Sequence, residues 1–90
     1  MYKITYTTDA VSDLQRLQSE EPKSYQKAKV LINELKEHPK TGTGHPEQLK
    51  GQPEGRWSRR ISKKHRLVYR IFDTEVLVLV LSAHGHYNDK

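Results

Sequence analysis

The chain has 90 residues, so it is expected to form one domain over residues 1–90, close to the smallest size that folds unaided. It contains no cysteine, which excludes disulfide bonds and thiolate metal ligands. No apolar run approaches the roughly 20 residues of a membrane-spanning helix, and residues 1–10 lack the apolar centre of a signal peptide. These features predict a small cytoplasmic protein that makes no contact with a membrane.

The net charge of +5 is concentrated in one part of the chain. Residues 1–49 carry seven Lys/Arg and seven Asp/Glu, whereas residues 50–70 carry eight Lys/Arg and a single acid, Glu54. Concentrated positive charge of this kind is typical of nucleic-acid-binding proteins, although it is also compatible with a solvated surface that keeps a protein soluble. We therefore expect the second half of the chain to face a polyanion.

The first half of the chain predicts a strand followed by a helical hairpin. Residues 2–6 alternate between apolar and polar side chains, which indicates a short strand, and Thr8 or Asp9 can cap the helix that follows. Pro22 suits the first turn of a second helix, and His38 before a proline ends it. The apolar residues at helical spacing are Ala10, Val11, Leu14 and Leu17, then Tyr25, Ala28, Ile32 and Leu35.

The second half predicts a turn-rich loop and then a sheet. Residues 40–55 contain repeated glycine and proline and are expected to form a functional loop. Strands are expected over residues 56–61, 65–72 and 75–83, and the last is apolar on both faces, which predicts the central strand. The fold class is therefore α+β: an N-terminal strand and a helical hairpin packed on a mostly antiparallel sheet.

Several side chains in this half could carry chemistry. Glu47 could act as a general base with Lys50 three residues later, although such a pair is also common as a surface ion pair. Arg60 and Arg66 flank a short turn, so both could project from the uncovered face of the sheet and bind phosphate. Trp57 could stack a base, but its apolar phase indicates a place in the core.

The C-terminal residues offer a candidate acid. His84, His86 and Tyr87 follow directly on the last strand, and histidine exchanges protons near neutral pH. The two histidines could also begin a metal site with His45 or His65, but the spacing matches no familiar metal motif. We therefore predict neither a metal nor another cofactor.

The segments PEQLKG and RWSRRISKKHRLVYRI, and a last strand that ends in HGHY, resemble the YoeB/Txe toxins of the RelE superfamily. The resemblance covers the whole chain and implies a microbial-ribonuclease-like fold in a type II toxin–antitoxin system. It implies a metal-independent endoribonuclease that cuts translated mRNA in the ribosomal A site. It further implies inhibition by a YefM/Axe-like antitoxin with an acidic C-terminal segment, and it suggests a homodimer.

The resemblance also assigns roles to particular residues. Glu47 becomes the base that activates the 2′-OH, Arg66 the phosphate ligand, His86 the acid and Tyr87 a nucleotide-positioning side chain. If the C-terminal register slips by two residues, His84 replaces His86 as the acid. The residues expected to bind RNA or phosphate are Lys50, Arg59, Arg60, Lys63 and Lys64, with Arg56 and Arg70 expected to dock ribosomal RNA.

Two other functions remain open at this point. The same basic surface could belong to a non-catalytic module that binds RNA or the ribosome. A gyrase inhibitor of the same fold is a third interpretation, which the combination of Glu47, Arg66 and His86 disfavours.

Overall fold

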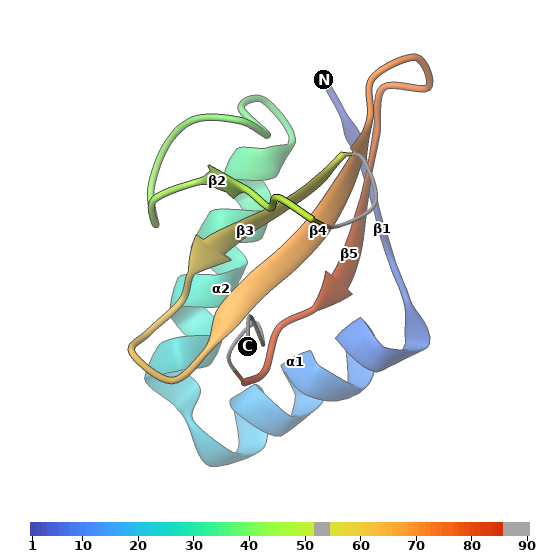
Figure 1. Cartoon of the computed structure of the whole chain (residues 1–90). Coiled ribbons are helices and arrows are strands. Elements are labelled where there is room, and N and C mark those ends of the chain that lie inside the picture. Colours follow the sequence, from blue (N-terminus) through green and yellow to red (C-terminus); the bar gives the residue numbers. More distant parts are fainter. Residues whose placement is uncertain (52–54, 86–90) are drawn as a thin grey trace.

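The computed structural model describes residues 1–51 and 55–85 of the chain, and these contain a helical hairpin and one mixed sheet (Figure 1). The elements in chain order are β1 (Lys3–Tyr6), α1 (Thr8–Glu20), α2 (Pro22–Leu35), β2 (Glu47–Gln48), β3 (Arg56–Arg60), β4 (Arg66–Phe72) and β5 (Leu77–Ser82). The expected α+β class is confirmed. Within these described ranges, neither helix has the length and apolar character needed to cross a membrane.

The five strands form one sheet in the order β1-β5-β4-β3-β2. The β2–β3, β3–β4 and β4–β5 pairs are antiparallel, and β1 pairs with β5 in parallel, which the long stretch of chain between these two strands permits. The strand β5 lies inside the sheet as its apolar sequence requires, but the middle position belongs to β4. The expectation that residues 75–83 form the central strand is therefore wrong by one position, because β5 is the neighbour of the central strand β4.

Both helices pack on the same side of the sheet; in the view of Figure 1, α2 passes behind the strands and α1 lies below them. Buried side chains of the helices meet alternate side chains of β4 and β5 in one apolar cluster. The fully buried members include Leu17 and Leu31 from the helices and Leu67, Tyr69 and Val78 from the strands. The alternation predicted for the middle strand is therefore confirmed, and among the described residues no helix packs on the other face of the sheet.

Local sequence explains where the helices begin and end. The cap of α1 is Thr7, whose Oγ1 accepts a hydrogen bond from the amide of Ala10 at 3.0 Å, so the expected caps Thr8 and Asp9 are wrong by one or two residues. Pro22 opens α2 as predicted, because its missing N–H group costs nothing in a first helical turn. Only Glu21 separates the two helices, which forces them into a tight hairpin.

The short strand β2 was not expected from the sequence, which predicted an uninterrupted loop there. Glu47 and Gln48 pair with Ser58 and Trp57 at the edge of the sheet. A two-residue strand in a segment rich in glycine and proline leaves no periodic pattern to read. The strand fixes Glu47 against β3.

Candidate active site

The register of the strands decides which face of the sheet each side chain occupies. Directly opposed residues of paired strands lie on the same face, and neighbours along one strand alternate. Tyr69 is fully buried on the helix side, so the residues of opposite phase belong to the uncovered face. Glu47 opposes Ser58, and Arg60 opposes Arg66, which places these four together on the uncovered face, meaning the face on which neither helix packs; Ser58 is nevertheless fully buried there.

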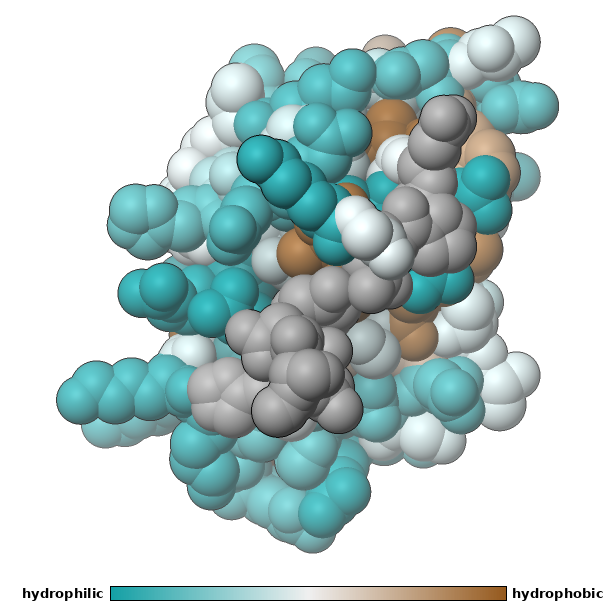
Figure 2. Space-filling model, in the orientation of Figure 1, coloured by the Kyte–Doolittle hydropathy of each residue, from teal (hydrophilic) through white to brown (hydrophobic). Residues whose placement is uncertain are grey.

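Glu47 and Arg66 are brought together on this face although they are far apart in the chain. Arg66 Nη1 lies 3.9 Å from Glu47 Oε1, and the side chains are 27% and 67% exposed, respectively. The carboxylate is accessible to a ligand, and the guanidinium beside it could bind a phosphate group. Figure 2 views the molecule from this side and shows a predominantly hydrophilic surface with apolar patches near its middle.

The segment that leads to Glu47 is fixed by close backbone packing on β3. The amide of Arg60 donates to the carbonyl of Gly44 at 2.6 Å, and the amide of Leu49 donates to the carbonyl of Arg56 at 3.0 Å. Gly44 has a φ of +86°, and a Cβ there would meet the carbonyl of Arg60 at 3.0 Å. Glycine is therefore required by both conformation and space, and it lets the loop approach the strand that carries Arg60.

Arg59 contradicts the expectation that it binds RNA. Its side chain is fully buried, because it shares the helix-facing phase of β3 with Trp57, and the buried Ile61 continues that phase directly after the strand. Its guanidinium donates to Glu34 Oε1 at 2.8 Å and to the hydroxyl of Tyr69 at 3.1 Å. Further bonds reach backbone carbonyls of the loop after α2, those of His38, Thr41 and Thr43. The guanidinium has no surface left for a phosphate.

The Arg59 network ties α2 and the following loop to the sheet. Glu34 also accepts hydrogen bonds from Thr43, at 2.9 Å from the amide and 2.7 Å from the hydroxyl. Thr43, followed by Arg59, holds the pKa of Glu34 below its ordinary value. Burial raises the pKa of Tyr69, although the hydrogen bond from Arg59 opposes that shift. The network thus stabilises the loop that precedes Glu47.

The other residues expected to bind RNA or phosphate lie on the surface. Arg60, Lys50, Lys63 and Lys64 are all exposed, and the two adjacent lysines occupy the turn between β3 and β4. Lys64 Nζ also lies 3.6 Å from Glu21 Oε2. This turn leads directly from Arg60 to Arg66, so its lysines extend the positive charge beyond the Glu47–Arg66 pair.

The C-terminal residues divide between described and undescribed positions. His86 and Tyr87 lie outside the described residues. His84 lies with its ring 4.3 Å from the ring of His65, and burial, followed by the charges of Arg16 and His65, lowers its pKa. His65 is itself buried and bound to Glu21, in the opposite phase to Arg66. His84 is therefore engaged toward the helical hairpin.

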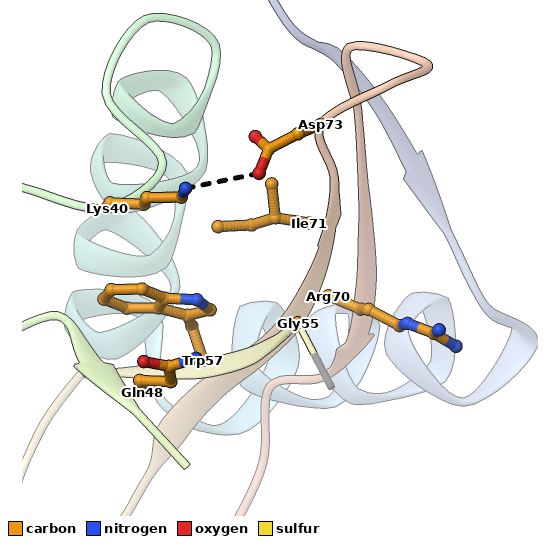
Figure 3. Close-up of a pocket in the computed structure, with 7 residues that line it drawn as sticks. All are labelled: Lys40, Gln48, Gly55, Trp57, Arg70, Ile71 and Asp73. Atoms are coloured by element: carbon orange, nitrogen blue, oxygen red, sulfur yellow. Dashed lines mark hydrogen bonds and ion pairs between the residues drawn. The ribbon is translucent and has the colours of Figure 1, made fainter. Parts of the chain in front are cut away.

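A pocket of about 510 Å³ lies between the end of α2 and strands β2 to β4 (Figure 3). Trp57 and Ile71 form its apolar walls, and Lys40 pairs with Asp73 across it at 3.2 Å. Gln48 lines the pocket and follows Glu47 in the same strand, so the two point to opposite faces. Trp57 packs against the core as predicted, and the pocket is separate from the Glu47–Arg66 pair.

The fold and this surface define a class of protein: a small basic α+β domain that presents an acid–arginine pair on an uncovered sheet face. The sequence model of the YoeB-like toxins of bacterial type II toxin–antitoxin systems matches residues 6–87. Toxin YoeB of Mycobacterium bovis is 39% identical over 87 residues, which cover 97% of this chain and 100% of that protein. The chain therefore belongs to the YoeB-like toxin family, within the RelE superfamily.

Solved structures agree with this assignment. A YoeB/ParE toxin from Agrobacterium tumefaciens is similar with a TM-score of 0.87 and 35% identity, covering 94% of this chain and 99% of that one. The structure of a YoeB dimer from Staphylococcus aureus, 32% identical, is also similar (TM-score 0.82, covering 96% of this chain and 98% of that one). The same toxin has been crystallised in a heterotetrameric complex with YefM (TM-score 0.80, covering 97% and 99%).

Proposed function

We propose that the whole chain, residues 1–90, acts as one ribosome-dependent endoribonuclease domain that cleaves translated mRNA and so inhibits translation. The observation that carries the proposal is the approach of Glu47 Oε1 to Arg66 Nη1 at 3.9 Å on the uncovered sheet face. A carboxylate beside a guanidinium provides a proton acceptor next to a phosphate ligand, the two functions that RNA cleavage needs first. Membership of a toxin family supports the same activity.

The reaction follows from these groups. Glu47 takes the proton of the ribose 2′-OH, and the 2′-oxygen forms a bond to the adjacent phosphorus while the bond from phosphorus to the 5′-oxygen breaks. Arg66, with Arg60 and Lys50, offsets the negative charge that develops on the phosphate oxygens. The products are a 2′,3′-cyclic phosphate and a 5′-hydroxyl. Because the nucleophile belongs to the substrate RNA, the reaction requires no metal ion.

The leaving 5′-oxygen needs a proton, which His86 donates in this mechanism, while Tyr87 positions the nucleotide. Both roles come from the resemblance to the family. The position of His84 supports the choice of His86, since the ring of His84 packs on His65 and away from the Glu47–Arg66 face. The exposed Lys63 and Lys64 extend the site toward the RNA backbone.

A cognate antitoxin is the natural partner of this activity. The complex of the Staphylococcus aureus relative with YefM supports an antitoxin of that kind, and the dimer of the same relative supports a homodimer of this chain. Action on translating ribosomes places the protein in the cytoplasm. An acidic antitoxin segment would suit the basic face around Arg66 and Arg60 by charge complementarity.

The test is expression of the toxin without its antitoxin, followed by primer extension on a translated message. The wild type is expected to arrest growth and to leave discrete breaks within codons. The variant Glu47→Gln removes the base and is expected to lower cleavage by about 10²- to 10⁴-fold. Glu37→Gln, a change at an exposed glutamate after α2, serves as the matched control and should cleave like the wild type.

Ribosomes that stall on an intact message would contradict the proposal and indicate a non-catalytic binder of RNA or the ribosome. Cleavage by Glu47→Gln at the wild-type rate would remove Glu47 from the mechanism while leaving the nuclease activity in place.

A further inference from the structure

His65 connects three segments that are distant in the sequence. It lies immediately before β4, is 2% exposed, and both of its ring nitrogens have partners. Nε2 lies 2.8 Å from Oε2 of Glu21, the residue between the two helices. Nδ1 accepts a hydrogen bond from the amide of Gly85 at 2.8 Å, close to the C-terminus. The imidazole thus bridges the helical hairpin and the segment that leads to His86.

These two contacts determine which nitrogen of His65 carries the proton. A backbone amide can only donate, so Nδ1 must offer its lone pair to Gly85. In a neutral imidazole the proton then belongs to Nε2, where it is donated to the carboxylate of Glu21. The hydrogen bond from His65 is the main reason that the pKa of Glu21 lies below its ordinary value, so an ionised acceptor faces the ring.

The same tautomer argues against a metal ion at this place. Ligand atoms of Glu21, His65 and His84 lie within 4.8 Å of one another, a cluster that resembles a three-ligand site. A metal bound to His65 would need a lone pair, but Nδ1 spends its lone pair on Gly85 and Nε2 carries a proton. The geometry of the cluster fits a hydrogen-bonded bridge.

Gly85 is held on its other side as well. Its carbonyl accepts a hydrogen bond from the amide of Arg66 at 3.0 Å, and the amide of Ala83 donates to Asp13 Oδ2 at 3.0 Å. Gly85 is therefore bonded both to the backbone of Arg66 and to the side chain of His65, the residue that comes before Arg66. This arrangement links His65 to the backbone of Arg66, the phosphate ligand of the proposed reaction, through one short path.

We propose that His65 is a positioning residue, which holds Gly85 through Nδ1 and so fixes the backbone of Arg66, whose amide donates to the carbonyl of Gly85. The inference rests on the proposed nuclease function, because it assigns His65 to the alignment of that reaction. Alignment matters in such a mechanism, since a displacement of about 1 Å between reacting groups can cost about 100-fold in rate.

Two amide variants separate the contacts of His65. In His65→Asn the side-chain oxygen lies near the position of Nδ1 and can still accept from Gly85, while the contact to Glu21 is lost. In His65→Gln the longer side chain reaches Glu21, and the acceptor for Gly85 is lost. Both variants remove the aromatic packing on His84 and both place an amide in the same buried position, so each controls for the other.

The measurement is the single-turnover rate of mRNA cleavage on programmed ribosomes. The same series gives the toxin concentration at which the rate is half of its maximum. His65→Asn is expected to stay within about threefold of the wild-type rate, and His65→Gln to fall by about 10- to 100-fold at unchanged half-saturation. Thermal melts show whether the two variants are equally folded. Equal rates for the Asn and Gln variants would overturn the proposal.

Nuclear magnetic resonance of the ¹⁵N-labelled wild type tests the bridge without any variant. We expect the proton of His65 on Nε2, a coupling across the bond from the Gly85 amide to Nδ1, and no change on addition of zinc chloride. A proton on Nδ1, or joint stoichiometric shifts of the His65 and His84 ring signals with zinc, would overturn the bridge. This result is independent of cleavage, so a wild type that leaves mRNA intact would refute the proposed function alone.

Discussion

Arg59 and Arg60 are neighbours in β3, and the pleat of the strand sends them to opposite faces of the sheet. Arg59 is fully buried on the helix side, with its guanidinium bonded to Glu34, Tyr69 and loop carbonyls. Arg60 is exposed on the uncovered face, opposite Arg66. The same type of residue thus stabilises the fold at position 59 and is available to a ligand at position 60. Only the face of the strand on which each arginine lies distinguishes the two.

The comparison shows that a basic stretch is not a uniform binding surface. The helix side uses arginine because a planar guanidinium with five donors can satisfy several buried oxygens at once. In the function proposed for the uncovered side, the same planar group binds two oxygens of a phosphate. Four substitutions test this division, ordered from the largest expected effect to the smallest.

Arg66→Ala should produce the largest effect on the uncovered side. Removing the group that offsets charge on the phosphate is expected to lower the cleavage rate by about 10²- to 10³-fold. Arg66→Lys is expected to recover little of the activity, because an ammonium cannot bind two phosphate oxygens in one plane. Single-turnover cleavage measures both variants, and a Lys variant as fast as the wild type would contradict the role given to the guanidinium.

Arg59→Met should produce the largest effect on stability. It leaves the Tyr69 hydroxyl and several loop carbonyls without their donor, and the free energy of unfolding is expected to fall by about 3 kcal/mol. Arg60→Met, one residue away, is the matched control and should change that free energy by no more than about 0.5 kcal/mol. Urea denaturation measures both. Similar losses in the two variants would refute the division between the faces.

Lys63→Ala in the β3–β4 turn should weaken RNA binding modestly and without sequence preference. The logarithm of the affinity falls linearly with the logarithm of the salt concentration, and the loss of one phosphate contact is expected to make this slope shallower by about 1. Lys23→Ala at the start of α2, on the helical side, is the control and should leave the slope unchanged. Binding of a labelled RNA over a salt series measures this, and equal slopes for both variants would exclude Lys63 from the interface.

Glu34→Gln, on the helix side of the sheet, should have the smallest effect, which should appear as a change in how stability depends on pH. Because the pKa of Glu34 is lowered in the fold, its ionised form stabilises the protein above the ordinary value of 4.5, and this contribution is lost as the pH falls through the lowered pKa. The wild type should therefore exceed the variant in stability at neutral pH, and the difference should shrink in acid. Urea midpoints over a pH series measure it, and a constant difference would contradict the linkage.

The sequence correctly located the side chains that alternate along the middle strand. Leu67, Tyr69 and Ile71 were assigned to the core and Arg66 to the other face from period alone, and burial confirms the core assignments. For Arg59 the concentration of charge predicts contact with RNA, and the structure instead buries its side chain. The sequence does contain a sign of this burial, because Arg59 falls on the same face as the apolar residues Trp57 and Ile61. An arginine buried on such a face needs hydrogen-bond partners for its guanidinium.

The bridge at His65 left no signal of this kind. Glu21 lies between the helices and Gly85 close to the C-terminus, so the three residues meet only after the hairpin has folded onto the sheet. Histidine before a strand is compatible with surface, core or catalysis. The tautomer of the ring became readable only when both partners were known.

The sequence by itself determined the fold class, the family resemblance, the concentration of positive charge and the alternation of the strands, because these depend on composition and on periods of local structure. The tertiary structure alone decided that Glu47 meets Arg66, that Arg59 is buried under the loop after α2, and that His65 holds Gly85. Each of these contacts joins residues distant in the chain or selects one of two faces. Strand register and helix packing, which no local pattern contains, determine both.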